Sequence, residues 1–539
     1  MAGQETAAAL PELAYTQSKN VPTLKSRAAT SDAPWPQISL ALMVMCSVAY
    51  FFATVKISGK SPLWMDEVMA AWLSLLPIKM ISPALAHGVM ASPPTYFYLL
   101  KAIRFLFGNS NLALRLPSIA GGYTVGMAVF FLTRRRFALP FATLAMALSL
   151  ETGILTYSTQ VREYTLVTAL FAVALLLWDK RREETFETWR AASIAVLLAA
   201  CIALHFYGVL LAAALALMEL LWAVANGRIR ARVWAGIVVA GGSLLAWYPL
   251  MRRIMSFTAH FAASKHYFAQ PSIPRLITAY QNVAFGGKGL TLACCLLAMI
   301  SFVFFWSKIY GVPVFTDRFE RIPAARSANL EIIVLGTVAV PLLVFLFAAV
   351  VTGTFNDRYA IAGTIGFAML AGMLVSYLRA GAAVSCALLA ASTFLLAITP
   401  KHATPADPYG IESLSLTGSN DPIVVGEGLA FLELQGEANA GLRNRLVYLT
   451  TPPGESNPDI TNEELVKQWK VFHPDLDVEA PADFLGQHGH FYVLHSNQTT
   501  DVITPWLVRS GRLKVAANQP EDKDNRNVWL FESIPGASH

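Results

Sequence analysis

The chain has 539 residues, of which 55% are hydrophobic and only 14% are charged, and its formal net charge is +6. Soluble globular proteins carry about a quarter charged residues, so this composition excludes a soluble enzyme or binding domain of this size. It predicts a polytopic α-helical membrane protein.

Long apolar segments give the number of transmembrane helices that we expect. About 17–25 apolar residues without charges are enough to cross a bilayer. About eleven such segments follow one another, and two of them are short. They lie near 37–57, 112–133, 139–157, 163–178, 191–204, 206–225, 233–251, 289–306, 329–351, 359–378 and 381–399.

The charges between these segments predict an orientation. Residues 1–36 contain three basic residues and no apolar signal core, which is typical of a flexible cytoplasmic tail. Every second connection is rich in Arg and Lys and is therefore expected in the cytoplasm. These connections contain Arg134–Arg136, Lys180–Arg182, Arg228–Arg232, Lys308–Arg326 and Arg379. The other connections face the opposite side, which we call the outer side.

The composition changes after the last apolar segment. Residues 401–539 contain 10 Lys and Arg against 19 Asp and Glu. An odd number of spans over residues 37–399 places residues 400–539 on the outer side. Short apolar segments alternate there with polar ones, which predicts a small soluble α/β domain with strands in 421–434, 445–449, 490–496 and 528–533.

The first outer connection contains SPLWMDEVMAAW (61–72), in which Asp66 and Glu67 lie between two tryptophans. One interpretation is structural: Asp66 is the N-cap of an interfacial helix and Glu67 lies in its first turn. The other is catalytic, with one carboxylate as general base and the other positioning it or binding a divalent cation. A second interfacial helix is expected after Pro93 and Pro94.

Basic and aromatic residues recur on the same outer side. Arg162 with Tyr164 and Arg358 with Tyr359 stand at the ends of two apolar segments, where few basic residues are expected. Either arginine could form an ion pair or bind a lipid headgroup. A bound phosphate is the alternative, because a guanidinium matches its oxygen atoms.

Further candidates lie in two other outer connections. His205 and Tyr207 stand at a turn, where a histidine is more often a helix-end residue than a catalyst. The connection 252–288 contains basic residues and no acid, so it should bind an anion, either lipid headgroups or a substrate phosphate. Its candidate ligands are Arg252, Arg253, Lys265 and Lys288.

Five motifs occur in a fixed order: LWMDE (63–67), SPPTYFYLL (92–100), YSTQVREYTL (157–166), HFYGVLL (205–211) and NDRY (356–359). With them the sequence resembles the bacterial C-type glycosyltransferases of the protein-mannosyltransferase and aminoarabinose-transferase superfamily. The resemblance extends over about residues 37–380. It implies an inner-membrane protein with its active site and C-terminal domain on the periplasmic face.

The resemblance also implies a reaction. A single sugar would pass from a polyprenyl phosphate to an acceptor hydroxyl with inversion. Asp66 matches the catalytic aspartate of the family and Glu67 the acid beside it, while Arg162, Tyr164, Arg358 and Tyr359 match positions near the donor phosphate. Some members carry a phosphate-binding lysine before the first proline of the second motif, where this chain has Ser92.

The chemistry needs a base for the hydroxyl and cations for the departing phosphate, and the outer side offers both. The acceptor would be a lipid, a polysaccharide or a protein, and we expect membrane lipid but no nucleic acid as a further partner. Two other functions fit part of the pattern. A transporter or flippase of a polyprenyl-linked sugar would also need phosphate ligands, and so would a glycan ligase or polymerase.

Overall fold

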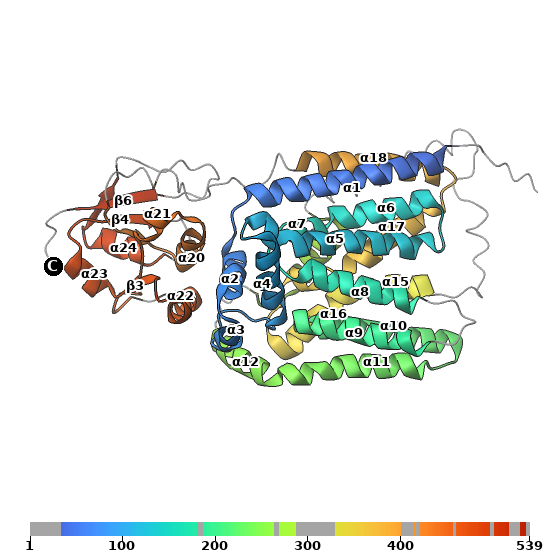
Figure 1. Ribbon diagram of the computed structural model, residues 1–539, viewed down its shortest axis with the longest axis horizontal. Helices are drawn as coiled ribbons and strands as arrows, with labels where there is room; N and C mark the ends of the chain where they lie inside the picture. Colours follow the sequence, from blue (N-terminus) through green and yellow to red (C-terminus); the bar gives the residue numbers. More distant parts are fainter. Residues whose placement is uncertain are drawn as a thin grey trace, which may run out of the picture.

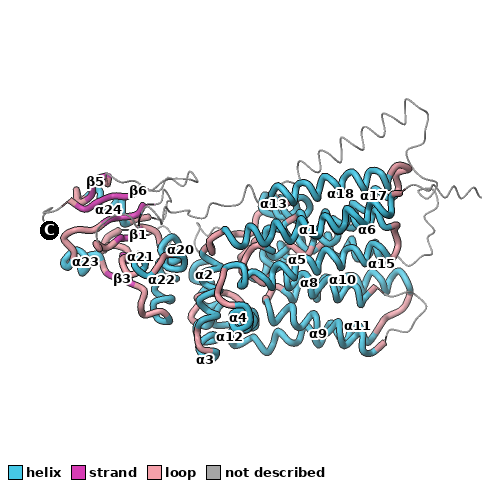
Figure 2. The backbone as a smooth tube through the Cα atoms, turned by 45° about the horizontal axis from the view of Figure 1, so that its top comes forward, coloured by secondary structure: helices cyan, strands magenta, loops and turns pink. Residues whose placement is uncertain are grey.

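The structure is a computed structural model. It describes residues 34–179, 187–262, 269–286, 329–399, 414, 420–455, 457, 460–495, 501–516 and 529–534. Most of these residues form a helical bundle, and those after residue 419 form a separate unit around a β-sheet (Figures 1 and 2).

Six described segments are long and apolar enough to cross a membrane. They are α1 (Trp35–Lys60), α5 (Asn111–Arg134), α10 (Gly208–Asn226), the continuous segment Ala231–Ser256, the continuous segment Asn329–Thr352, and α18 (Gly381–Ile398). Four apolar helices are shorter: α6 (Leu139–Glu151), α8 (Tyr164–Trp178), α9 (Thr188–Leu204) and α17 (Gly363–Ser376). The predicted segment 289–306 lies outside the described residues, so the total of eleven spans stays a prediction.

The two continuous segments contain changes of helix type. Ala231–Ser256 consists of α11 (Ala231–Gly242), a 3₁₀ turn (η1, Ser243–Trp247) and the first half of α12 (Tyr248–Ala262). Asn329–Thr352 consists of α15 (Asn329–Val338), α16 (Val340–Phe347) and a π-helical turn (η2, Ala348–Thr352).

Helix α5 lies at the centre of the bundle, packed against α6 and α8. Its glycines allow this close approach, as small residues do between membrane helices. A Cβ on Gly121 would lie 2.8 Å from the main-chain nitrogen of Leu166 in α8, and one on Gly126 would lie 2.8 Å from the Leu150 side chain in α6. Any larger residue at either position would force these helices apart.

One end of the bundle is covered by three short helices, α2 (Met65–Leu75), α3 (Ile78–Ala86) and α4 (Thr95–Phe107), and we call it the α2 end (Figure 1). The helices predicted for the first outer connection are therefore present, and their position at the membrane surface stays a prediction. The connection 252–288 differs from the expectation of a loop, because α12 continues to Ala262 and α13 covers Ile273–Phe285. Both helices have a strongly apolar side, which the basic residues of this segment obscured in the sequence.

The opposite end of the bundle contains the described part of the basic connections. Arg135 there forms an ion pair of 3.0 Å with Asp179, and Arg136 forms one of 3.5 Å with Glu331. Helices α5, α8, α10 and α17 all end on this side. The alternation of basic connections therefore predicted correctly which chain segments share an end.

The C-terminal unit is a six-stranded sheet with the order β3-β2-β1-β4-β6-β5. Strands β1 to β4 are parallel, and β6 is antiparallel to both β4 and β5. The strands are β1 (Ile423–Val425), β2 (Leu446–Leu449), β3 (Asp477–Glu479), β4 (Tyr492–His495), β5 (Leu513–Val515) and β6 (Trp529–Ser533). The helices are α20 (Gly428–Glu437), α21 (Ala440–Arg443), α22 (Ile460–Phe472), α23 (Pro481–Gln487) and α24 (Ile503–Arg509). This is the α/β organisation that the alternating segments predicted.

Candidate active site

Asp66 lies in the first turn of α2, and its carboxylate points into the α2 end of the bundle. The N-cap of α2 is Trp64, so the alternative in which Asp66 caps the helix is wrong. Arg358 Nη1 donates a hydrogen bond of 2.7 Å to Asp66 Oδ2, and Arg162 Nη1 lies 3.6 Å from the same oxygen. Asp66 is only 8% exposed, so this triad of one acid and two arginines is largely withdrawn from water.

The two arginines come from different parts of the chain. Arg162 lies between α7 (Gly153–Ser158) and α8, and its main-chain oxygen accepts a hydrogen bond of 2.7 Å from Ser118. Arg358 lies in the 3₁₀ turn η3 (Asp357–Ala360), whose start is capped by the Asn356 side chain. Both guanidinium groups lie over the ring of Tyr164, at 5.1 Å and 5.6 Å from its centre. One aromatic side chain therefore supports both cations.

Each arginine also has a side-chain nitrogen that makes no hydrogen bond. The Nε atoms of Arg162 and Arg358 are buried and make no hydrogen bond. Buried donors of charged groups are normally satisfied, and their exceptions cluster at sites that bind a ligand. Two such donors beside one shared carboxylate leave hydrogen-bonding capacity for an additional anion.

The electrostatics of the triad follow from this geometry. Burial by itself would raise the pKa of Asp66, but the charges of Arg162 and Arg358 outweigh it and hold the pKa below its usual range. The pKa of Arg358 is raised despite its burial, because Tyr164 and Tyr359 interact with it and Asp66 pairs with it. Asp66 is therefore a carboxylate at neutral pH, as a general base must be.

Glu163 connects three of the predicted residues. Ser92 donates a hydrogen bond of 2.9 Å to Glu163 Oε1, and His205 Nε2 lies 3.7 Å from the same oxygen. Arg162 Nε lies 4.0 Å from Glu163 Oε2, which is the outer limit for an ion pair. Burial lowers the pKa of His205 to about 4, against the opposing effect of Glu163. His205 is therefore neutral at physiological pH and can act as a hydrogen-bonding group but not as a cation.

Glu67 faces away from the two arginines and binds a residue that the sequence did not point out. Arg115 of α5 donates to both of its oxygens, at 2.9 Å and 2.8 Å, and both side chains are 1% exposed. The same guanidinium donates to the main-chain oxygens of Ser58, Ser61 and Pro62. The main-chain nitrogens of Trp64 and Val161 also donate to Glu67. Glu67 thereby ties the start of α2 to α1, α5 and the segment that carries Arg162.

An apolar cavity of about 510 Å³ opens beside Arg358. Its polar rim contains Arg358, Tyr359, His205 and Tyr207, with the Tyr207 and Tyr359 rings stacked at 4.2 Å. Its apolar walls come from α12, α16 and η2. An elongated apolar molecule with an anionic end would place that end at Arg358.

The remaining predicted residues lie elsewhere. Arg252 and Arg253 are exposed on α12, whereas Met251, Ile254 and Met255 of the same helix line the cavity. Lys265 and Lys288 lie outside the described residues. Within the described ranges, no group of three or more His, Cys, Asp or Glu side chains is arranged to bind a metal ion.

No family model and no curated protein matches the sequence. Solved structures do match. The aminoarabinose transferase ArnT from Cupriavidus metallidurans superposes with a TM-score of 0.57 at 14% identity, over 93% of this chain and 98% of that one. The chain has the ArnT fold.

A second structure of the same enzyme, bound to undecaprenyl phosphate, gives the same TM-score and identity over 93% of this chain and 99% of the other. The archaeal oligosaccharyltransferase AglB from Archaeoglobus fulgidus is more distant, with a TM-score of 0.39 at 13% identity over 85% of this chain and 69% of that one. The C-type fold that the five motifs indicated is thus confirmed through ArnT.

Proposed function

We propose that the protein is a membrane glycosyltransferase that transfers a single sugar from a polyprenyl phosphate to an acceptor hydroxyl. The observation that carries this proposal is the triad of Asp66, Arg162 and Arg358, whose Arg358 lies at the rim of an apolar cavity. The cavity suits a polyprenyl chain, the two arginines, whose Nε atoms make no hydrogen bond, suit its phosphate, and the carboxylate suits a base. The ArnT fold, solved elsewhere with undecaprenyl phosphate, agrees with this donor.

In the proposed reaction, Asp66 removes the proton of the acceptor hydroxyl. The hydroxyl oxygen attacks the anomeric carbon, and the bond from that carbon to the phosphate oxygen breaks. The leaving group is a phosphate monoester with a second pKa of about 6, so a separate acid is not needed. Arg162 and Arg358 stabilise its growing charge, and attack opposite the leaving group inverts the anomeric configuration.

Asp66 pairs with the same two arginines that we propose as ligands of the phosphate. When the donor binds, its phosphate competes with this carboxylate for the same donors. The pKa of Asp66 is then less strongly lowered, because part of the positive charge is neutralised. Donor binding would thereby turn a paired carboxylate into a stronger base.

Glu67 has a positioning role in this proposal. Its oxygens already accept hydrogen bonds from Arg115, Trp64 and Val161. This is an alternative to the role of metal ligand that we considered for Asp66 and Glu67. His205, Tyr207 and Tyr359 would contact the donor head group at the rim of the cavity. The protein would be a multi-pass inner-membrane protein with the α2 end in the periplasm.

The test uses the purified chain in lipid nanodiscs with a panel of radiolabelled polyprenyl-phosphate sugars and membrane extract as the source of acceptor. We expect one labelled sugar in the acceptor fraction with the wild type and none with Asp66→Asn. Asp179→Asn is the matched control, because Asp179 is also paired with an arginine but lies at the opposite end of the bundle.

Other results would contradict the proposal. Label that stays on the polyprenyl phosphate while the donor changes leaflet would identify a transporter. A product extended by many sugars would identify a ligase or polymerase. Wild-type transfer by Asp66→Asn would remove the proposed base.

A further inference from the structure

The C-terminal domain contacts the helix that carries Asp66. Helix α20 packs against α2, and α22 lies beside the same end of the bundle (Figure 1). The approach of the two helices is close, because a Cβ on Gly436 of α20 would lie 2.7 Å from the side chain of Val68 in α2. A residue larger than glycine at 436 therefore could not sit there without moving one of the helices.

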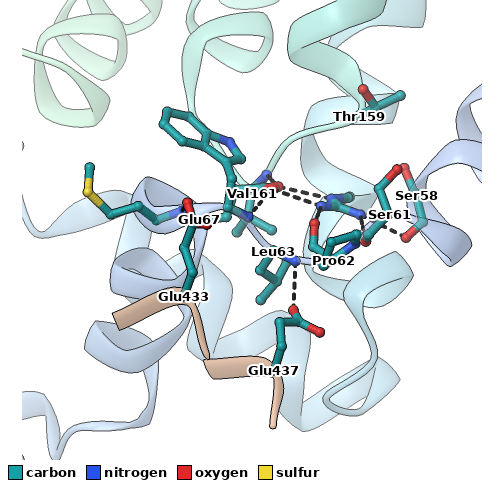
Figure 3. A network of polar contacts seen from close by, with 12 residues as sticks. Ser58, Ser61, Pro62, Leu63, Glu67, Thr159, Val161, Glu433 and Glu437 are labelled. Carbon is teal, nitrogen blue, oxygen red and sulfur yellow. Dashed lines mark hydrogen bonds and ion pairs between the residues drawn. The ribbon is translucent and has the colours of Figure 1, made fainter. Parts of the chain in front are cut away.

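Two carboxylates of α20 hold the first residues of α2. Glu437 Oε1 accepts a hydrogen bond of 2.6 Å from the main-chain nitrogen of Leu63, and Glu433 Oε1 accepts one of 2.9 Å from that of Met65. Glu67 accepts from the nitrogen between them, that of Trp64. Figure 3 shows Leu63 and Glu67 beside Glu433 and Glu437 of α20. The three main-chain nitrogens that precede Asp66 thus all donate hydrogen bonds to carboxylates, two of which belong to the C-terminal domain.

These contacts add to a local cap, in which Glu67 accepts a hydrogen bond from the nitrogen of the N-cap residue Trp64. The first main-chain N–H groups of a helix have no partner within it and are usually satisfied by Ser, Thr, Asp or Asn at the N-cap. The N-cap of α2 is Trp64, which carries no oxygen in its side chain. Negative charge at a helix start is also favoured by the helix dipole. The main-chain nitrogens of Met65 and Leu63 therefore depend on acceptors that lie 368 and 374 residues away in sequence.

The other half of α2 is held by aromatic contacts to α22. The ring of Trp72 lies edge-on to Trp469 at 5.3 Å and 4.9 Å from the ring of His473. His87, at the end of α3, meets Phe472 at 5.4 Å. The C-terminal domain therefore contacts α2 both before and after Asp66 in the sequence. A rotation of α2 would break either the hydrogen bonds to α20 or the ring contacts to α22.

We propose that the C-terminal domain is a positioning part of the active site, in which Glu433 and Glu437 fix the orientation of Asp66 towards Arg162 and Arg358. This rests on the proposed role of Asp66 as the base. Catalytic groups must be held to within a fraction of an ångström, and a misplacement of about 1 Å can cost 100-fold in rate. Glu433 accepts a hydrogen bond from the main-chain nitrogen of Met65, the residue next to Asp66, and so acts directly on the placement of the Asp66 carboxylate.

The first test measures main-chain hydrogen exchange and needs no substrate. The full chain in nanodiscs is compared as wild type, as E433A/E437A and as E433Q/E437Q, with exchange followed by mass spectrometry in peptides that cover residues 61–72. We expect exchange at Leu63 and Met65 to rise about tenfold in the alanine variant, equivalent to about 1.4 kcal/mol. The glutamine variant should stay near the wild type, because its amide oxygen is still an acceptor.

The second test separates positioning from binding. In E433A/E437A we expect the affinity for undecaprenyl phosphate to stay within about twofold, since both arginines are intact, while kcat of sugar transfer falls at least tenfold. The glutamine variant should recover most of the rate. Glu455→Ala is the control, because Glu455 pairs with the exposed Arg509 within the C-terminal domain and should change neither quantity.

Gly436→Ala tests the docking itself. Alanine favours a helix over glycine, so α20 should be retained while its approach to Val68 is blocked, and kcat should fall as in E433A/E437A. Gly486→Ala in α23 is the matched control, since a Cβ there meets nothing within 4 Å. Wild-type exchange at Leu63 and Met65 in E433A/E437A would overturn the proposal. So would raised exchange with an unchanged kcat. A wild type that exchanges as expected but transfers no sugar would instead refute the proposed function.

Discussion

Replacing Asp66 with Asn should change donor binding and turnover in opposite directions. In the ligand-free protein the Asp66 carboxylate is 2.7 Å from Arg358 and 3.6 Å from Arg162. A phosphate bound to both arginines would add a negative charge about 5 Å from that carboxylate. At an effective dielectric constant of about 20, the repulsion between them is about 3 kcal/mol.

Partial exposure of Asp66 and Arg358 screens this repulsion, so about 1–2 kcal/mol should remain, equivalent to roughly a 5- to 30-fold change in affinity. Asp66→Asn removes the charge and should therefore bind undecaprenyl phosphate more tightly by this factor. Its turnover should fall by about 10²- to 10⁴-fold, because the variant has no general base.

The assay combines two measurements on the same nanodisc preparation. Native mass spectrometry gives the affinity for undecaprenyl phosphate, and transfer of radiolabel from the donor gives kcat. Asp179→Asn should change neither. Weaker lipid binding by Asp66→Asn would show that the phosphate does not compete with this carboxylate, and the reasoning about the triad would then be refuted.

Three further predictions concern neighbouring groups. Arg358→Ala should weaken undecaprenyl phosphate binding at least tenfold, and Arg358→Lys should restore only part of it because lysine lacks the bidentate geometry; equal affinities for all three proteins would contradict this. Arg115→Met should destabilise the fold by about 3–5 kcal/mol, since it leaves Glu67 buried without a cation, and thermal unfolding should show partial recovery when Glu67→Gln is added. The pKa of Asp66 is held below its usual range and that of His205 is lowered to about 4, so kcat/KM should be flat from about pH 5 to pH 8 and be lost only as the pH falls through the pKa of Asp66. A transition near pH 6.5 would contradict that assignment.

The sequence predicted which residues share one end of the bundle but not how they pair. Asp66, Arg162 and Arg358 stand at segment ends that the charge alternation assigned to one side, and the structure brings them within ion-pair distance. Charge alternation indicates the end of the bundle at which a residue lies, whereas the choice of partner depends on packing. Arg115 and Glu67 illustrate this, because their pairing depends on how α2 lies across α5. The only signal for Arg115 was its position as a basic residue at the outer end of an apolar segment.

The fold of the C-terminal domain was likewise predicted only in part, and its contacts were not predicted. Strands β1, β2, β4 and β6 lie in segments predicted from their apolar residues, but β3 and β5 have too little apolar character to stand out. The roles of Glu433 and Glu437 could not be predicted, since a strand was expected within 421–434 whereas both residues lie on α20. Their partners are main-chain nitrogens of a distant segment, and main-chain contacts leave no pattern in residue types.

The most direct test of the central claim is a cryo-electron microscopy structure of the full chain in nanodiscs with undecaprenyl phosphate. We expect the phosphate oxygens within about 3 Å of guanidinium nitrogens of both Arg162 and Arg358, with the lipid chain in the adjoining cavity and the Asp66 carboxylate released from Arg358. A phosphate bound elsewhere, for example at the exposed Arg252 and Arg253, with the Asp66–Arg358 pair still intact, would contradict the account.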